Sequence, residues 1–373
     1  MKNMSYKIIK KDLNTKARIG IFKTTHGTIK TPFFMPVVTK GIAKFITLDH
    51  LEEIKTQCFI SNAYLLYLKP GEDLLRETKG YHNFINWKKP IFTDSGGFQL
   101  KNKEFFISMT EKGVWFRSPY DGSKHFMSPE RVMQLQNIIG SDVGMVLDDM
   151  QDANLSREDY EKAVENTISW AKRAIAVHNN KKQFIFGIVQ GGTSRDLREK
   201  CAKEINKLPF DGIAIGGLAL GESKENMHKA IDYSLNNLDE NKIKYLMGVG
   251  SPEDIILSIS KGVDCFDSIY PTKMARHGHI FTRKGPINLK KAKYKEILEP
   301  IERECDCSTC KRHTLAYLHH LLRQEEPGVK ILLSLHNIRF IHRLLEEARK
   351  EIEKGTFESF SNKFLKEYKR EKL

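Results

Sequence analysis

The stretch FIFGIVQ at residues 184–190 sets the expectation for the fold, and GIAIGG at 212–217 and IKYLMGVG at 243–250 repeat its character. Each is a short, near-continuous apolar run, which is typical of a parallel strand buried on both faces. Similar runs lie on either side: PFFMPVV at 32–38, CFISN at 58–62, PIFTD at 90–94, VGMVLDD at 143–149 and VDCFD at 263–267. The sequence therefore predicts eight β-strands.

Helix signals separate these runs. Ser128 stands before Pro129, and Ser251 stands before Pro252, so that a serine can cap a helix whose first position is proline. Eight strand-and-helix units match a closed parallel barrel, whereas an open doubly wound sheet more often stops at about five or six strands. We expect the α/β class and a (β/α)8 TIM barrel over residues 1–270.

Composition and charge narrow the kind of protein and of partner. The 373 residues are 40% hydrophobic and 10% aromatic, which excludes a disordered chain and a small disulfide-stapled scaffold. The 61 basic and 47 acidic residues give a net charge of +14, which favours a polyanionic partner such as nucleic acid. No apolar run reaches the roughly 18 residues of a membrane span, and the opening residues lack a signal-peptide core. We expect a cytoplasmic protein without a membrane partner.

The pattern changes after residue 270. Basic residues from Lys273 to Lys295 occur with no acidic residue between them, so this segment is either a solvated face or a contact for phosphates. Apolar positions then recur at helical spacing from Ile338 until Gly355, which predicts an amphipathic helix. We expect residues 271–355 to form a basic segment and a zinc-binding subdomain, and residues 356–373 to form a basic tail.

A metal site is expected within this appendage. Cys305, Cys307 and Cys310 lie too close together for a disulfide framework to be the simplest explanation. A closed tetrahedral site needs a fourth ligand, and His336 is favoured because it lies in the apolar run LLSLHNI. From the residues alone, other candidates for this ligand remain open: His313, His319 and His320. We expect one structural Zn²⁺ per chain.

Polar residues stand at the ends of most predicted strands. They are Asn62, Asp94, Asp148 with Asp149, Gln190 and Asp267. A single carboxylate after a strand is often only a helix cap or a turn residue, but several at one mouth of a barrel favour an active site. Paired carboxylates suit chemistry at the anomeric carbon of a sugar, where one is the nucleophile and the other moves a proton.

Several motifs together resemble the tRNA-guanine transglycosylase family. They are FMPV at 34–37, TDSGGFQ at 93–99, FRSPYDGSKHF at 116–126, FGIVQGG at 186–192, AIGGLALGE at 214–222, YLMGVGSPED at 245–254, FDSIYPTKMAR at 266–276, and CDCSTC at 305–310 with a later HN at 336–337. The resemblance implies a (β/α)8 barrel with a zinc subdomain. It also implies exchange of guanine at the wobble position of tRNA for a 7-deazaguanine base.

The resemblance assigns roles to individual residues. Asp267 matches the nucleophile that attacks ribose C1′, and Asp94 matches the general acid/base. The positions that match the base-binding residues are Asp148, Gln190, Gly217, Phe98 and Met247. Lys273 and Arg276 fall where the family contacts tRNA, and the zinc ligands match Cys305, Cys307, Cys310 and His336. A homodimer, or a heterodimer with a paralogous subunit, is also implied.

Departures from the family pattern bear on specificity. Ala63 and Leu65 replace the usual threonine and histidine after the second strand, and Lys273 replaces arginine, which loses bidentate geometry. Asp149 resembles the queuine-using enzymes, whereas the bulky Leu220 favours the smaller 7-aminomethyl-7-deazaguanine. The sequence leans toward the smaller base.

Other functional classes remain as alternatives. One is a non-catalytic tRNA-binding subunit, against which both Asp94 and Asp267 argue, and another is a paralogue that acts on DNA. An unrelated retaining glycoside hydrolase would share the barrel and the paired carboxylates. It would explain neither the cysteine cluster nor the basic segment.

Overall fold

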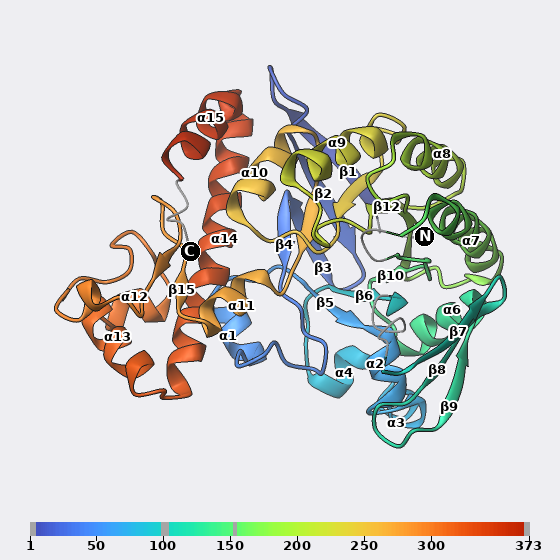
Figure 1. Ribbon diagram of the computed structural model, residues 1–373, viewed down its shortest axis with the longest axis horizontal. Helices are drawn as coiled ribbons and strands as arrows, with labels where there is room; N and C mark the ends of the chain where they lie inside the picture. The colour runs from blue at the N-terminus through green and yellow to red at the C-terminus, as the bar shows by residue number, and fades with distance from the viewer. Residues whose placement is uncertain (1–4, 98–103, 152–154, 369–373) are drawn as a thin grey trace.

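The computed structural model describes residues 5–97, 104–151 and 155–368 (Figure 1). At its centre, eight parallel strands follow the order β4-β14-β13-β12-β11-β10-β6-β5. Their bounds are β4 Phe33–Met35, β5 Phe59–Asn62, β6 Ile91–Asp94, β10 Val143–Met145, β11 Phe184–Val189, β12 Gly212–Ile215, β13 Ile243–Leu246 and β14 Cys265–Asp267. All eight predicted strands are confirmed. Their sequences are apolar runs because both faces of each strand are buried.

The two outer strands of this sheet meet and nearly close the barrel. Val37 and Ile60 form a parallel bridge just beyond β4. The Val38 amide donates to the Ile60 carbonyl at 2.8 Å, and the Ile60 amide donates to the Pro36 carbonyl at 3.1 Å. The predicted barrel, rather than an open doubly wound sheet, is therefore the architecture of this chain.

Helices connect successive strands and surround the barrel. Their bounds are α1 Leu48–Glu53, α2 Ala63–Leu68, α3 Glu72–Glu77, α4 Tyr81–Ile85, α6 Pro129–Ile139, α7 Arg157–Val177, α8 Arg195–Asn206, α9 Lys224–Leu235, α10 Pro252–Ser260 and α11 Tyr270–Arg276. Ser128 and Ser251 cap α6 and α10 as predicted, each accepting a backbone hydrogen bond from the first turn. Both helices begin with the predicted proline.

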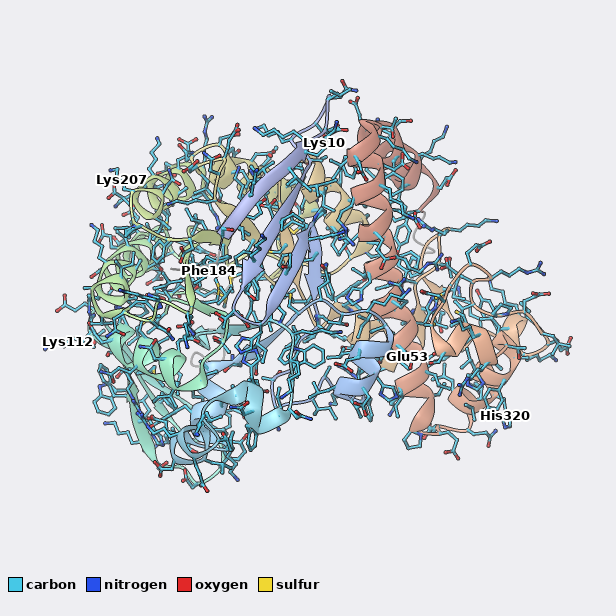
Figure 2. The ribbon with its side chains drawn as sticks, turned by 180° about the vertical axis from the view of Figure 1, so that it is seen from behind. Lys10, Glu53, Lys112, Phe184, Lys207 and His320 are labelled. Carbon is cyan, nitrogen blue, oxygen red and sulfur yellow. The ribbon has the colours of Figure 1, made fainter. Side chains whose placement is uncertain are left out.

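A three-stranded antiparallel sheet covers the amino-terminal end of the barrel (Figure 2). It consists of β1 Ser5–Lys11, β2 Arg18–Thr24 and β3 Gly27–Thr31. The centroid of the Phe22 ring lies 4.7 Å from that of Phe184 and 6.3 Å from those of Phe92 and Phe186. Phe22 therefore closes the amino-terminal end of the barrel. The carboxyl ends of the strands are left for a site.

A second antiparallel sheet stands outside the barrel. It consists of β7 Phe106–Thr110, β8 Gly113–Arg117 and β9 Lys124–Met127. The Phe116 ring of β8 packs edge-on against Tyr64 of α2, with centroids 4.9 Å apart. Because α2 follows directly after β5, this sheet buttresses one side of the barrel mouth.

The carboxyl-terminal part begins with short elements and ends in two long helices. The bounds are β15 His279–Ile280, β16 Ile287–Asn288, η1 Ala292–Tyr294, α12 Ser308–Arg312, α13 Leu315–Arg323, α14 Gly328–Lys354 and α15 Phe357–Glu367. Helix α14 begins ten residues before the predicted start at Ile338, because Val329, Leu333 and Leu335 are buried against the cysteine-bearing segment.

The segment expected as a basic tail contains a packed helix. Phe357 and Phe364 of α15 are buried together with Tyr368 against α10 and α14, so residues 357–368 belong to the folded body. Their helical spacing places these rings on one face, a pattern hidden among the many lysines and glutamates.

Among the helices in the described ranges, none combines the length and apolar character that a membrane span requires.

Candidate active site

Strand register brings the polar strand ends to one mouth of the barrel. Asn62 pairs with Asp94 across β5 and β6, while Asp267 pairs with Met35 across β14 and β4. Asp148 and Gln190 follow the neighbouring strands β10 and β11 at the same end. In parallel barrels, this is the end where active sites are built.

Asp267 is held by two hydrogen bonds to one carboxylate oxygen. The Tyr245 hydroxyl donates to Oδ1 at 2.6 Å, and the Gly248 amide donates to the same atom at 2.9 Å. Burial raises the pKa of Asp267, and these two donors act against that rise. Burial also raises the pKa of Tyr245 well above its usual value, so the phenol stays a donor. The carboxylate is therefore held in one orientation, which is what a nucleophilic carboxylate requires.

Asp94 has a different environment. Its Oδ2 accepts a hydrogen bond from Asn62 Nδ2 at 3.2 Å. Burial and then the negative charges of Asp148 and Asp267 raise the pKa of Asp94 to about 7. A group with this pKa can both give and take a proton at neutral pH, which suits a general acid/base. The two carboxylates at this mouth therefore differ in their surroundings, since two donors hold Asp267 while the charges of Asp148 and Asp267 act on Asp94.

Asp148, Gln190 and Gly217 form a connected polar wall. The Gln190 amide donates from Nε2 to Asp148 Oδ2 at 2.6 Å, and both side chains are buried. Gly217 has a φ of +65°, and a Cβ built there would lie 2.2 Å from Gln190 Oε1. Glycine adopts this backbone at little cost, and a side chain here would displace the amide. The wall offers donors and acceptors to the edge of a flat ligand.

Other predicted site residues lie around this wall. Met247 follows β13, is partly buried and packs on the barrel core. Lys273 is exposed on α11, and it lines a cavity of 290 Å³ together with Gly248 and Ser268 beside Asp267. Arg276 is on the same helix, where its Nη1 donates to Thr272 Oγ1 at 3.2 Å. The predicted stacking residue Phe98 lies outside the described residues.

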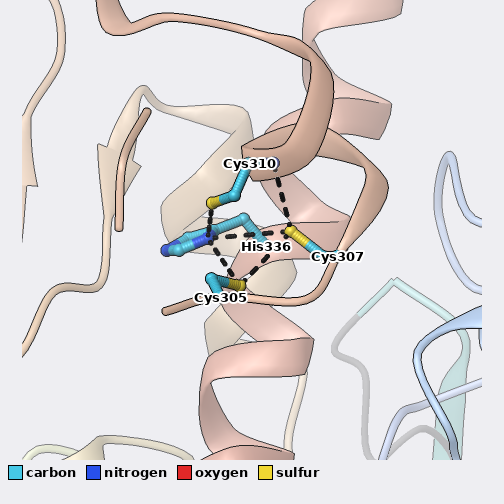
Figure 3. Close-up of side chains that lie close together, drawn as sticks. All are labelled: Cys305, Cys307, Cys310 and His336. Atoms are coloured by element: carbon cyan, nitrogen blue, oxygen red, sulfur yellow. Dashed lines mark hydrogen bonds between the residues drawn. The ribbon is translucent and has the colours of Figure 1, made fainter. Parts of the chain in front are cut away.

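The predicted metal ligands form a buried cluster between residues 305–310 and α14 (Figure 3). His336 Nδ1 lies 3.7, 4.0 and 3.2 Å from the sulfurs of Cys305, Cys307 and Cys310, and the first two sulfurs are 3.5 Å apart. A tetrahedral Zn²⁺ with Zn–S bonds of about 2.3 Å would set its ligand atoms about 3.7 Å apart. His336 Nε2 faces the Phe281 carbonyl at 2.8 Å, which orients the ring. The cluster could therefore hold a metal.

A second group of potential ligands lies near the amino-terminal end of the barrel. His26 and His82 both reach Asp142, at 3.0 and 3.2 Å, while their rings stack with centroids 3.6 Å apart. The in-plane lone pairs of stacked rings run side by side and do not converge on one ion. Asp142 also accepts hydrogen bonds from the backbone amides of His26 and Ile91. This cluster joins the turn between β2 and β3 to the first residues of β6 and β10.

Two positioning side chains were missed by sequence reasoning. Tyr245 belongs to an apolar run and to the motif at 245–254, and neither assigns it a role, although a tyrosine in a fully buried strand needs a partner for its hydroxyl. Asn337 accepts from the Phe281 amide at 2.9 Å and donates to the Pro271 and His279 carbonyls at 3.0 Å. It joins α14, next to the metal cluster, to the segment that follows Asp267.

These features define a class of protein: a parallel (β/α)8-barrel enzyme with paired carboxylates suited to transfer at a sugar carbon. A model of the family described as "Queuine tRNA-ribosyltransferase" matches residues 12–370. The chain belongs to this family.

Relatives similar to the chain along nearly its whole length carry the same description. A queuine tRNA-ribosyltransferase of Dictyoglomus turgidum is 43% identical over 99% of this chain and 96% of its own length. One of Caldanaerobacter subterraneus is 44% identical over 99% and 98%, and one of Halothermothrix orenii is 43% identical over 98% of both chains. The family predicted from the motifs is thus confirmed.

Proposed function

We propose that this protein exchanges guanine at the anticodon wobble position of tRNA for a 7-deazaguanine base, through a covalent ribosyl-aspartate. The observation that carries the proposal is the Asp267 carboxylate, fixed at the barrel mouth by Tyr245 and Gly248 opposite a second carboxyl whose pKa is near 7. Full-length similarity to queuine tRNA-ribosyltransferases supports the substrate class.

In the first half of the reaction, an Asp267 oxygen attacks ribose C1′ and the bond from C1′ to guanine N9 breaks. The electron pair of that bond passes to the base, and the protonated Asp94 supplies a proton to it. In the second half, Asp94 accepts the proton of the incoming base. That base then attacks C1′ and restores the Asp267 carboxylate, so two inversions give net retention.

The base would bind against the polar wall. Asp148 and Gln190 offer an acceptor and an amide to its edge, and the absence of a side chain at Gly217 leaves room for the Gln190 amide beside the backbone. Met247 would cover one face, and Phe98 would stack on the other. Reading a flat base between apolar faces is a common solution for enzymes that act on bases.

The incoming base is proposed to be 7-aminomethyl-7-deazaguanine. Asp149, the residue that resembles queuine-using enzymes, is engaged elsewhere: Asn166 Nδ2 and Gln151 Nε2 each donate to its carboxylate at 2.8 Å. The bulk of Leu220 is the remaining difference, and it favours the smaller base. A competition assay with labelled guanine tests this, since stronger competition by queuine than by the aminomethyl base would contradict it.

The tRNA is proposed to lie across the mouth and the basic segment of the appendage at 271–355. Exposed Lys273 and the partly buried Arg276 on α11 would contact bases beside the exchanged one, and the following lysines would neutralise phosphates. The metal is proposed to be structural Zn²⁺, held by the cysteines and His336. We further propose a cytoplasmic enzyme that works as a dimer, either with itself or with a paralogous subunit.

The decisive experiment is incorporation of radiolabelled guanine into unmodified tRNA with guanine at the wobble position. Wild type should label this tRNA, and Asp267→Asn, which keeps the shape of the side chain, should not. Asp149→Asn is the matched control, because it also changes one buried acid near the mouth but not a reacting group. Wild-type binding of tRNA without labelling would contradict the proposal and favour a non-catalytic subunit.

A further inference from the structure

Arg198 is a fully buried arginine directly behind the base-binding wall. It lies on α8, one turn after the residue that precedes the helix, Ser194. Side chains on a helix tilt toward its amino terminus, so the guanidinium reaches back past the start of α8. There it meets the loops that follow β11 and β12.

The guanidinium donates to three backbone carbonyls. Nε reaches the carbonyl of Gly192 at 2.7 Å, Nη1 that of Val189 at 3.0 Å, and Nη2 that of Gly217 at 3.3 Å. Val189 and Gly192 stand on either side of Gln190, while Gly217 is itself part of the wall. One planar group thus joins the two loops that carry the base-binding residues.

The loops are shaped to fit around this group. Gly191 and Gly192 have φ values of +134° and +54°, in the region that glycine adopts at little cost. A Cβ on Gly191 would lie 2.9 Å from the Arg198 amide nitrogen, so the loop wraps closely on the start of α8. The loop after β12 is fixed from its other end, where Glu222 accepts from the Ala219 and Leu220 amides at 2.5 and 2.9 Å.

Burial of this charge is expensive for the fold. Burial lowers the pKa of Arg198 to about 10, with the negative charge of Glu222 among the effects that oppose the fall, so the group remains a cation at neutral pH. The three carbonyls that accept its hydrogen bonds are neutral and supply no full compensating charge. An apolar side chain of similar length would avoid the desolvation cost. A role beyond packing explains its presence better.

We propose that Arg198 is a positioning residue for base recognition, which holds Gln190 and Gly217 at a fixed separation by binding the carbonyls around them. This inference rests on the proposed function. Lysine cannot replace it, because an ammonium on a flexible stem lacks the planar fork that reaches three acceptors at once. Losing the clamp should loosen the wall while leaving Asp94 and Asp267 in place.

The test compares Arg198→Lys and Arg198→Met with a control, Arg349→Met. Arg349 also donates from a helix to a backbone carbonyl, that of Pro32, but at the amino-terminal end of the barrel. Base exchange is measured by varying guanine at saturating tRNA, and then by varying tRNA at saturating guanine. Thermal unfolding of each protein is recorded alongside.

Both Arg198 variants should raise KM for guanine about tenfold or more, with kcat and KM for tRNA changed less than about threefold. Arg349→Met should lower the melting temperature without a selective rise in KM for guanine. If Arg198→Met does not fold, the charge-conserving Arg198→Lys carries the test. An unchanged KM for guanine in an active, folded Arg198→Lys would overturn the inference. Absence of exchange in wild type would instead contradict the proposed function.

Discussion

Adding one methyl group at Gly217 tests the polar wall directly. In Gly217→Ala the new Cβ would lie 2.2 Å from Gln190 Oε1, so the amide must move. The amide is the far end of a flexible side chain, so the collision itself costs the fold little. The backbone at φ +65° adds about 1 kcal/mol for alanine. The moved amide gives up its 2.6 Å contact with Asp148.

The larger effect should fall on base binding. Losing one buried hydrogen-bond partner of the base costs about 1–3 kcal/mol, which corresponds to about a 5- to 150-fold rise in KM for guanine. Initial rates of guanine incorporation at saturating tRNA measure this KM. Gly140→Ala is the matched control, because Gly140 has a φ of +68° and open space around its Cβ position at the end of α6.

The control should lose similar stability in thermal unfolding and keep the wild-type KM. The reasoning is refuted if Gly217→Ala has a KM for guanine within about twofold of wild type while it unfolds like the control. In that case the position of the Gln190 amide would not set the affinity for the base.

Two further predictions concern protons and metal. Because the pKa of Asp94 is raised to about 7, kcat/KM for tRNA should fall as pH rises above 7 and the general acid loses its proton. Asp94→Asn should be more stable than wild type at both pH 8 and pH 6, with the larger gain at pH 8, where the buried carboxylate is charged. A flat rate profile, or equal stabilisation at both pH values, would contradict this assignment. If the proposed structural metal is bound, treatment with a chelator, or Cys310→Ser, should expose the carboxyl-terminal part to limited proteolysis. An unchanged digestion pattern in metal-free protein would contradict the proposed structural metal.

Much of the barrel could be predicted because parallel strands leave a strong pattern. Both faces of β11 to β13 are covered, so their sequences are apolar without alternation, and polar residues start where the strands end. The cysteine spacing and the strand-end acids were equally visible. The fourth ligand of the predicted metal site could only be ranked, since five histidines follow the cysteines and only the fold shows which one faces them.

Other features depend on contacts between distant segments. The sheet β1 to β3 and the outer sheet β7 to β9 have half-exposed strands that resemble ordinary polar sequence. Arg198 sits on a helix with many charged neighbours, and periodicity cannot distinguish a buried cation from a solvated one. Helix α15 was hidden for the same reason, because its three aromatic rings are spread among exposed lysines and glutamates.

Helix α14 is one continuous helix of 27 residues, about 40 Å long at 1.5 Å per residue. Its first half packs on the cysteine-bearing segment and its second half on the barrel core, while Asn337 in between bonds to the segment after Asp267. A gene fragment that stops near residue 270 would therefore encode a barrel with a bare apolar flank. Expressed without the other, each part should aggregate and not give a monodisperse product, because α14 covers apolar surface of both.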